Sequence, residues 1–354
     1  MASKRGLRVL VTGVADRLGA ELARRLQDDA EVGDIYGIDV KDPTRPLGRT
    51  EFVHADTRHS VIAKLVRELR IQVVVHCAVV THQLESVRSM HETNVIGTMN
   101  VLAACAGETS PVEHIVLKSS TAVYGVDPTG PSFLTEDMAG TRPRRGPLQS
   151  DLLEMEQLAL EFALRNPRTS LTMLRLADVV DRRSDTPLAR YLSLPVVPTM
   201  MGFNPRVQFL HGEDAVEALQ RAVFGRQRGV FNVAAPGVLS LTQAIQLAGG
   251  RPVPLLPGLL GPLERLAVSG LAGVPLTPRL QELITHGQVV DCALLLHEFG
   301  WEPARDNRTV MAEFAHPVEE FVEGGEAAPV QERQLESYLL RRRLRGHDAR
   351  TLLQ

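Results

Sequence analysis

Two glycines and an aspartate near the N-terminus have the residue types and the spacing that bind phosphate and ribose groups. Gly13 directly follows an apolar run, Leu7–Thr12, and Gly19 lies at the start of a segment with apolar residues at helical spacing. Glycines at a strand-to-helix turn allow the backbone to approach a pyrophosphate, which then rests on the helix N-terminus. Asp39 follows Gly19 by 20 residues at the end of the next apolar run, where a carboxylate accepts hydrogen bonds from a ribose. The pattern favours a dinucleotide-binding turn over a strand–helix turn that binds nothing.

The turn departs from a glycine-rich sequence at Asp16, where a third glycine is expected. A carboxylate beside a pyrophosphate would repel it in a partly dehydrated site. Asp16 could instead cap the helix and occupy the anion position itself, and Arg17 could offset its charge. The sequence leaves open whether the turn binds a dinucleotide or is blocked by its own carboxylate.

Two carboxylates bear on the identity of the nucleotide. Asp39 favours NAD over NADP, because a 2′-phosphate would meet a like charge. Asp56, in the run His54-Ala-Asp56, is either an adenine contact or a helix N-cap before Thr57. We therefore expect NAD as the cofactor.

Strand and helix patterns alternate along the first half of the chain and must position this turn. Continuous apolar runs predict strands at Leu7–Thr12, Ile35–Val40, Val73–Ala78, His114–Lys118 and Leu171–Leu176. Apolar residues at helical spacing predict helices at Leu18–Leu26, Val61–Leu69, Thr93–Cys105 and Leu152–Leu164. This alternation over about 175 residues indicates an α/β fold, a doubly wound parallel (Rossmann) sheet with helices on both faces.

The pattern loosens after residue 180, where prolines punctuate the sequence and predict loops. One helix is predicted at Glu213–Val223 and one strand at Val230–Val233. We expect three parts, which are a Rossmann domain at 1–180, a small C-terminal substrate lobe at 181–323 that partly returns to the sheet, and a charged tail at 324–354.

The composition excludes several classes of protein. The 354 residues are 44% hydrophobic and 23% charged with a formal net charge of −3, which excludes a disordered or fibrous chain and gives no overall attraction to nucleic acid. The three cysteines are too few and too scattered for a disulfide framework or a zinc cluster, and they are expected to be small buried residues. Neither a signal peptide nor a membrane span is expected, so the predicted location is the cytoplasm. The Pro-, Leu- and Gly-rich residues 253–276 form either a helix that closes the lobe or a peripheral membrane contact.

Ten segments follow the order and spacing of a known family over about 310 residues. They are VTGVADRLG (11–19), IDV (38–40), HADTRH (54–59), VVHCAV (74–79), NVIGTMNVLAAC (94–105), LKSSTAVYG (117–125), LRLADVV (174–180), FLHGEDAVEAL (209–219), GVFNVA (229–234) and FGWEP (299–303). In these segments the chain resembles the NAD-dependent epimerase/dehydratase family, which are extended short-chain dehydrogenases/reductases.

The resemblance implies a Rossmann domain that binds NAD and a C-terminal lobe that holds a small-molecule substrate. In the family this substrate is often a nucleotide sugar and sometimes a lipid-like alcohol. The helix Leu152–Leu164 resembles the family's dimerisation helix, which implies a homodimer. The cofactor-binding positions implied by the resemblance are Gly13, Asp16, Arg17, Leu18, Gly19, Asp39, Asp56 and Ala78.

The family's chemistry rests on a Ser or Thr, a Tyr, and a Lys four residues after the Tyr. Ser120 matches the serine by its place in the segment SSTAVYG. Matching Ser150 to the serine of the family's Y-x-x-S-K segment places Pro147 at the tyrosine and Asp151 at the lysine. Proline has no acidic group, and aspartate reverses the charge of lysine. The residues four positions after the four tyrosines are Val40, Pro128, Pro195 and Arg342. No lysine follows Lys118, so the usual tyrosine-based hydride mechanism is absent.

Other residues near the expected crevice have alternative roles. Tyr124 could replace the missing acid, although its position in the family normally has a packing role. Asp151 could form a general base pair with Glu154, or it could be solvated in the first helical turn and stabilise the helix dipole. Asn94 matches a helix asparagine whose role in the family is chiefly structural.

Arg175 ends the fifth predicted strand at the crevice where ligands bind. It could clamp a phosphate or carboxylate, or it could pair with Asp178 or Asp181. No metal is expected, and a solvated turn rather than a metal site is predicted at His54, Asp56 and His59.

Two functional hypotheses follow. The first is an NAD-binding oxidoreductase that acts on a nucleotide-sugar or lipid-like hydroxyl at an atypical acid–base site. Its candidate catalytic residues are Ser120, Tyr124 and Asp151. The second is a catalytically inactive pseudoenzyme that binds a cofactor or ligand in a regulatory or scaffolding role. The glycines, Asp39 and Ser120 favour the first hypothesis. Asp16, Pro147 and Asp151 favour the second.

Overall fold

The computed structural model describes residues 6–82, 86–126, 131, 133–141, 144, 146–255 and 274–315. Most of the apolar segment 253–276 and the whole predicted tail 324–354 lie outside these residues, as do the predictions made for them. No helix within the described ranges is long and apolar enough to cross a membrane.

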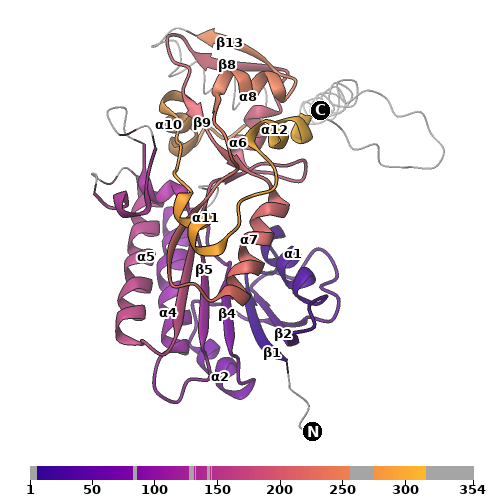
Figure 1. The fold of residues 1–354 in the computed structure, drawn as a ribbon, viewed down its shortest axis with the longest axis vertical. Coiled ribbons are helices and arrows are strands. Elements are labelled where there is room, and N and C mark those ends of the chain that lie inside the picture. Colours follow the sequence, from indigo (N-terminus) through magenta and orange to yellow (C-terminus); the bar gives the residue numbers. More distant parts are fainter. Residues whose placement is uncertain are drawn as a thin grey trace, which may run out of the picture. The chain divides into compact units, whose positions relative to one another are not determined.

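A seven-stranded parallel sheet forms the centre of the described N-terminal part (Figure 1). Its strands are β1 (Leu7–Thr12), β2 (Val32–Asp39), β3 (Glu51–His54), β4 (Val73–His76), β5 (His114–Ser120), β6 (Ser170–Leu176) and β11 (Gly229–Val233). Their order across the sheet is β11-β6-β5-β4-β1-β2-β3. Strands β4, β5 and β6 are buried along their whole length, as expected when helices cover both faces of a sheet. The predicted doubly wound α/β fold is confirmed.

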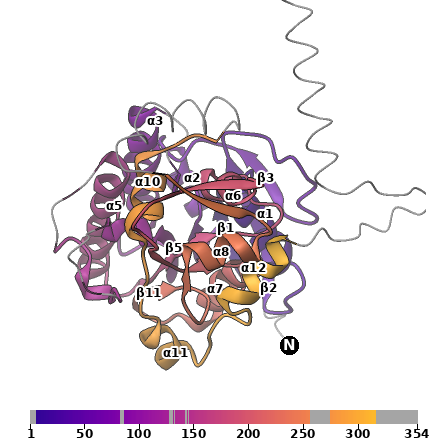
Figure 2. The same cartoon turned by 90° about the horizontal axis from the view of Figure 1, so that it is seen from above.

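Two groups of helices flank this sheet, one on each side (Figures 1 and 2). The helices are α1 (Arg17–Leu26), α2 (Val61–Glu68), α3 (Val87–His91), α4 (Thr98–Cys105), α5 (Pro147–Arg165), α7 (Gly212–Gly225) and α11 (Ala293–Phe299). Helix α1 packs against α7, whereas α4 packs against both α2 and α5. The strand and helix patterns of the first half were therefore found at the expected places, with ends shifted by a few residues.

The sheet and its helices differ from the sequence expectations in two places. Strand β3 was not predicted, because its four residues are half-exposed at the sheet edge and lack an apolar run. The predicted helix Thr93–Cys105 is part of a longer one, in which a π-helical turn, Glu92–Gly97, joins α3 to α4. That turn buries Asn94, whose amide accepts from the Val80 backbone N–H at 2.7 Å and donates to the Val80 carbonyl at 2.9 Å. These bonds give Asn94 the structural role that the resemblance implies.

The C-terminal lobe has its own hydrophobic core, which includes Tyr191, Phe209 and Val310. Its helices are α6 (Pro187–Leu192), α8 (Leu241–Leu247), α10 (Pro278–His286) and α12 (Asn307–Ala315). Its short strands pair as β8 (Val196–Met200) with β13 (Arg251–Leu255), β9 (Arg206–Val207) with β12 (Leu239–Ser240), and β7 (Asp178–Val179) with β10 (Phe209–Leu210). Several of these elements lie where loops were predicted, because two-residue strands and a six-residue helix are too short to show a periodic pattern.

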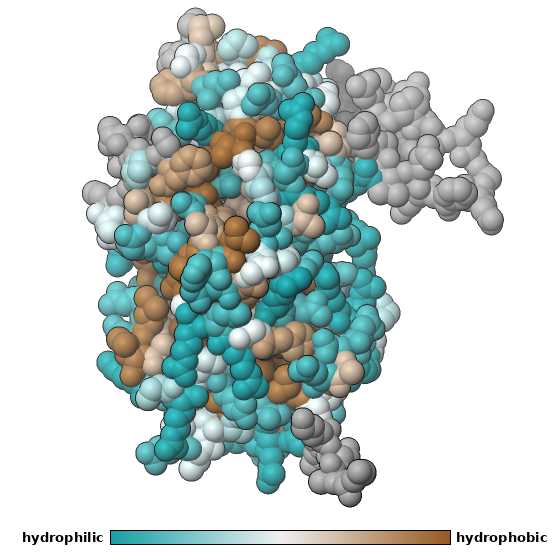
Figure 3. All heavy atoms as spheres, in the orientation of Figure 1, coloured by the Kyte–Doolittle hydropathy of each residue, from teal (hydrophilic) through white to brown (hydrophobic). Residues whose placement is uncertain are grey.

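Helix α5 presents apolar side chains to solvent at its C-terminal half. Leu160 is 44% exposed and Leu164 is 83% exposed. Figure 3 shows hydrophobic residues along the edge of the molecule formed by this helix. A surface of this kind is typical of a contact with another protein chain.

Arg175 on β6 lies in a buried polar cluster beneath α5. Its guanidinium donates to both carboxylate oxygens of Glu156, with a closest contact of 2.7 Å, and to the Tyr124 hydroxyl at 2.8 Å. Both charged side chains are only 4% exposed. The expectation that Arg175 clamps a ligand or pairs with Asp178 or Asp181 is therefore wrong. Successive strand residues face opposite sides of a sheet, and Arg175 faces the side that α5 covers.

We predict that Glu156→Ala lowers the free energy of unfolding by about 3–5 kcal/mol, because it leaves the Arg175 guanidinium buried without its counter-ion. Urea denaturation measures this change. The matched control is Glu161→Ala on the same helix, which removes a surface ion pair with Arg165 at 3.7 Å. This variant is expected to lower the free energy of unfolding by at most about 1 kcal/mol. Equal losses in the two variants would contradict the prediction.

Candidate functional site

The turn between β1 and α1 packs closely against the end of β4. Gly13 has a φ of +77°, and a Cβ at this position would lie 2.7 Å from the Ala78 backbone nitrogen. A Cβ at Gly19 would overlap the Gly13 carbonyl oxygen. The Ala78 N–H donates to the Thr12 hydroxyl at 3.1 Å, which ties the ends of the two strands together. Only glycine fits both positions, and helix α1 begins directly after this tightly packed turn.

Asp16 occupies the N-cap position of α1, but its side chain makes no capping hydrogen bond. The residue is exposed. The expectation that its carboxylate caps the helix is therefore wrong, because the side chain is directed to solvent instead of back to the first helical turn. A solvated carboxylate remains next to the anion-binding turn and acts on a ligand only through its charge.

Asp39, at the end of β2, forms hydrogen bonds with the backbone of the turn on the side away from β4. One carboxylate oxygen accepts from the Ala15 backbone N–H at 2.9 Å and the other from the Lys41 backbone N–H at 3.1 Å. The side chain is half-buried, and an ionised carboxylate has about four lone-pair sites. Asp39 can therefore hold the turn and still accept hydroxyl donors.

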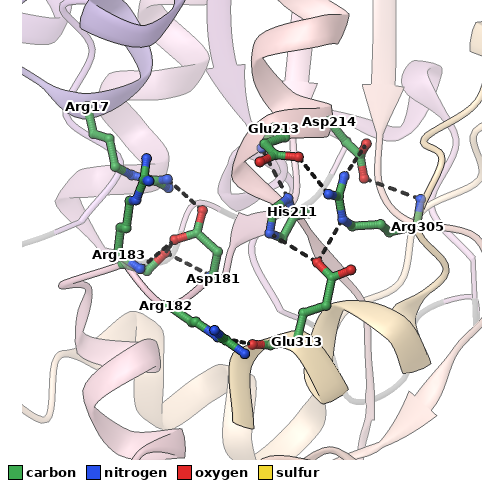
Figure 4. Close-up of polar contacts among 10 residues, drawn as sticks. Arg17, Asp181, Arg182, Arg183, His211, Glu213, Asp214, Arg305 and Glu313 are labelled. Carbon is green, nitrogen blue, oxygen red and sulfur yellow. Dashed lines mark hydrogen bonds and ion pairs between the residues drawn. The ribbon is translucent and has the colours of Figure 1, made fainter. Parts of the chain in front are cut away.

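Arg17 does not offset the charge of Asp16, as was expected, but pairs with Asp181 at 2.5 Å (Figure 4). Asp181 follows β7 on the lobe side and is buried, and its second oxygen accepts from the Arg183 backbone N–H. A Cβ at Gly212, the first residue of α7, would lie 2.6 Å from the Arg17 guanidinium. The ion pair thus joins the first turn of α1 to the lobe where the two parts meet.

A second ionic cluster lies beside it at the start of α7 (Figure 4). Arg305 contacts three carboxylates, which belong to Glu213, Asp214 and Glu313. His211, the N-cap of α7, lies 3.5 Å from Glu313. Burial lowers the pKa of His211. This cluster fixes α7 against the segment that leads into α12.

Asp56 pairs with Arg58, which donates to both of its carboxylate oxygens. Hydrogen bonding from Arg58 lowers the pKa of Asp56. Helix α2 begins later, with Ser60 at its N-cap, so the helix-capping alternative for Asp56 is wrong. The adenine contact stays a prediction. Leu18, another expected cofactor position, is partly buried against the core at the start of α1.

Two of the candidate catalytic residues lie at the end of β5. The Ser120 hydroxyl is buried and accepts from the Ala122 backbone N–H at 3.2 Å, so its proton is still available to a ligand. The Tyr124 hydroxyl donates to Asn232 at 2.6 Å and accepts from Arg175, and burial raises its pKa to about 12. A phenol that is fully bonded within the core is a poor proton donor to a ligand, and we assign Tyr124 a structural role.

Helix α5 carries the positions that the resemblance assigns to tyrosine and lysine. Pro147 is the first residue of α5, where proline is favoured. Asp151 is buried, and its Oδ1 lies 2.8 Å from Nδ1 of His91 on α3. Its Oδ2 is buried without a hydrogen-bond partner among the described residues. Asp151 is therefore not the solvated first-turn residue that was expected, and it does not pair with Glu154.

Sequence reasoning missed two residues with unusual surroundings. His91 precedes the matched segment by three residues, and nothing in its spacing shows that it meets α5. Arg279 on α10 contacts Asp178 at 3.4 Å and also Gln288, while its Nε and Nη1 are buried with no hydrogen-bond partner in the part of the chain that the structure describes. Arg279 follows a proline in a segment with no motif, so only the fold brings it to Asp178.

The remaining polar candidates have ordinary surroundings. His76 on β4 lies between the hydroxyls of Thr12 and Thr98, and burial lowers its pKa to about 3. His54 and His59 are exposed and lie 3.6 Å from Asp42 and 3.9 Å from Asp56 respectively. No cluster of three His, Cys, Asp or Glu side chains that could hold a metal ion occurs in the described part of the chain.

Comparisons with known proteins identify the family. A family model described as NAD dependent epimerase/dehydratase matches residues 9–234. The uncharacterized protein Rv0501 of Mycobacterium tuberculosis is 37% identical over 308 residues, which are 83% of this chain and 80% of that protein. UDP-glucose 4-epimerase of Thermotoga maritima, solved with UDP-glucose, has a TM-score of 0.66 at 16% identity over 87% of this chain and 97% of its own. The dTDP-glucose 4,6-dehydratase of Bacillus anthracis, solved with NAD, has a TM-score of 0.65 at 16% identity. The match covers 88% of this chain and 96% of that protein's chain.

These matches agree with the parallel sheet, the glycine turn and Asp39 at the end of β2. The chain therefore belongs to the NAD-dependent epimerase/dehydratase family.

Proposed function

We propose that the protein binds NAD at the carboxyl ends of the parallel strands and acts there on a hydroxyl of a nucleotide sugar or a lipid-like alcohol. The observation that carries this proposal is the glycine turn, in which Gly13 has a positive φ and packs against Ala78 with no room for a side chain. Helix α1 begins directly after this turn, and a pyrophosphate in such folds rests on the helix N-terminus. The dinucleotide seen in solved relatives of the same fold supports this assignment.

The residues present fit the adenosine half of NAD. Asp39 would accept the hydroxyls of the adenosine ribose, and Gly13 and Gly19 would leave room for the pyrophosphate. Asp56 lies two residues after β3, where adenine is expected. Asp16 opposes the pyrophosphate by charge but leaves the turn open, because its side chain is in solvent. The site therefore has room for the adenosine half of NAD, but the charge of Asp16 weakens the binding of its pyrophosphate.

The proposed chemistry is that of an altered acid–base site. When bound, NAD would supply a hydride acceptor for oxidation of the carbon that carries the substrate hydroxyl. Ser120 would hold that hydroxyl, since its own proton is not used within the protein. Neither Pro147 nor Tyr124 can move the hydroxyl proton, so this step must use a different group from that of the family.

An anionic substrate is supported by Arg279 of the lobe. Its side chain is 13% exposed, and two of its guanidinium nitrogens lack partners among the described residues. Buried donors without acceptors are costly unless a ligand satisfies them, and guanidinium matches phosphate in geometry. A nucleotide sugar supplies such a phosphate, and UDP-glucose occupies the related structure from Thermotoga maritima.

A second candidate function is a pseudoenzyme that binds a cofactor or ligand without turnover. Pro147 and the buried hydroxyl of Tyr124 favour it, because they leave no conventional acid in the site. An activity assay distinguishes an enzyme from a pseudoenzyme. UDP-glucose with NAD⁺ is expected to give a change in sugar stereochemistry or a steady NADH signal if the protein is an enzyme, and a Ser120→Ala variant should lose it.

We also propose that the protein is a cytoplasmic homodimer that associates through α5. The exposed side chains of Leu160 and Leu164 on this helix support the contact. A membrane contact by residues 253–276 remains a proposal from composition, since most of that segment lies outside the described residues.

Asp39→Ala is expected to weaken NAD⁺ binding about 10- to 100-fold, because hydroxyl bonds to a charged acceptor contribute roughly 1.5–3 kcal/mol. Calorimetric titration measures the change. Asp34→Ala is the matched control on the same strand, and its affinity should equal that of the wild type. Failure of the wild-type protein to bind NAD⁺ at millimolar concentration would end the proposal.

Asp16→Gly is expected to tighten NAD⁺ binding by about tenfold, because it removes a charge that repels the pyrophosphate. Asp16→Asn should give a similar gain, and raising the salt concentration should shrink both gains by screening. Adenosine, which has no phosphate, serves as the control ligand and should bind all three proteins equally. A gain for Asp16→Gly alone would point to loop geometry and against repulsion.

A further inference from the structure

Lys118, near the end of β5, is a buried lysine without a counter-ion. The residue is 6% exposed. Its ammonium forms no hydrogen bond or ion pair with the residues that the structure describes, yet it is not one of the fully enclosed polar atoms, so solvent reaches it. Lysine is almost never buried to this extent unless it is paired, and an unpaired buried charge is unfavourable. A side chain held in this state is suited to an acceptor that arrives with a ligand.

The register of the sheet places Lys118 level with the glycine turn. Three register partners lie one residue earlier on β1, β4 and β5, and they are Thr12, His76 and Leu117. Gly13, Cys77 and Lys118 follow them and therefore form one row across the sheet. Only β4 separates β5 from β1, so the backbones at Lys118 and Gly13 are about 10 Å apart. A lysine side chain and a bound diphosphate can together span this distance.

Lys118 faces the side of the sheet on which α1 lies. His114, four residues earlier on β5, contacts the Ala222 carbonyl of α7 at 2.9 Å. Side chains four residues apart on a strand share a face, so Lys118 also faces the α7 side, where α1 packs against α7. Ser119 agrees with this alternation, because its hydroxyl donates to Glu156 of α5 on the opposite side. Lys118 therefore has the same face and the same level as the turn that leads into α1.

Lys118 and Asp16 bring opposite charges to the end of β4. Burial raises the pKa of Cys77 to about 11, and the charge of Lys118 opposes this effect while that of Asp16 adds to it. Burial lowers the pKa of His82, which follows β4, and the same two charges act on it as well. No ion pair of the described residues joins Lys118 to Asp16. An anion bound over the end of β4 thus meets an attractive charge from the sheet and a repulsive charge from the turn.

We infer that Lys118 is an anion-binding residue whose ammonium donates to a phosphate oxygen of the ligand, and that this contact offsets the repulsion by Asp16. An ammonium group is a compact charge with three donors, and it binds phosphate in many proteins. The family resemblance assigns no role to residue 118, since the lysine of its catalytic motif belongs to α5. The inference rests on the proposed function for the source of the phosphate, which is the dinucleotide or the nucleotide sugar. It adds that a buried side chain of the sheet selects for this phosphate.

Ligands with and without phosphate test the inference by calorimetry on the full-length protein. ADP-ribose and UDP-glucose each contain a diphosphate, whereas adenosine and uridine contain none. Lys118→Met keeps an apolar side chain of similar length and removes the charge. It is expected to weaken the binding of ADP-ribose, UDP-glucose or both by about 10- to 100-fold and to leave the nucleosides unchanged. The diphosphate ligand that loses affinity identifies the source of the phosphate. Lys64→Met, at an exposed position of α2, is the matched control and should behave like the wild type.

Further measurements separate binding from folding. Ligand-free Lys118→Met should unfold at an equal or higher temperature than the wild type, because it removes an unpaired buried charge. Lys118→Arg keeps the charge and should keep the preference for diphosphate ligands over nucleosides. Lys118→Gln removes the charge but keeps a polar group, so it should show the same loss and decides the question if the methionine variant does not fold. A lower unfolding temperature with an unchanged preference would show a structural role and overturn the inference.

A double variant tests whether Lys118 binds the ligand or only balances the charge of Asp16. If the lysine only balances the aspartate, Asp16→Asn combined with Lys118→Met regains the wild-type affinity, which would overturn the inference. If the lysine binds phosphate, the double variant stays about 10- to 100-fold weaker than Asp16→Asn alone, because the lost contact is not replaced.

The outcomes distinguish this inference from the proposed function. Equal losses for diphosphate ligands and nucleosides, or no loss at all, would overturn the role of Lys118 while NAD⁺ binding stands. Binding of UDP-glucose that depends on Lys118, without any binding of ADP-ribose or NAD⁺, would support the role and overturn the proposed cofactor. If no diphosphate ligand binds the wild-type protein, both proposals fall.

Discussion

The close contact between Gly13 and the end of β4 is the constraint on which the rest of the site depends. Because a Cβ at Gly13 would overlap the backbone at Ala78, β1 and β4 end side by side and α1 starts directly above them. The Asp39 carboxylate accepts a hydrogen bond from the Ala15 N–H of the same turn, which holds the end of β2 against this turn. The end of β4, the end of β2 and the first turn of α1 are therefore held relative to one another by close backbone packing and by the Asp39 side chain.

Charged residues that depart from the family pattern are mostly paired within this frame. Arg17 forms an ion pair with Asp181, and Asp151 contacts His91 at 2.8 Å. Both pairs connect segments far apart in the sequence, and in each pair one member is buried, so the geometry of the pair is restricted. Asp16 is different, because it lies in solvent and has no capping bond. The site has thus exchanged the charge pattern of its family for another one, instead of simply losing polar groups.

Much of the fold could be predicted from local patterns, but most of the ionic contacts could not. The apolar runs of β1, β4 and β5 indicate buried strands, and the two glycines indicate the turn, from local sequence alone. A single sequence is therefore enough to place these elements. Arg175 shows the limit, because the side of the sheet that it faces, and its pairing with Glu156, depend on the packing of α5. His91 and Asp151 are 60 residues apart and carry no shared motif. The short strands of the lobe are stabilised by tertiary contacts and leave no periodic signal.

The packing of Gly212 on the Arg17–Asp181 pair has a consequence for how relatives of this protein can vary. A side chain at residue 212 has no space while the guanidinium lies against it. An evolutionary replacement of this glycine by a larger residue therefore requires a smaller or uncharged partner at 17 or 181. These three positions should covary as one unit in an alignment, although they lie in three different segments of the chain.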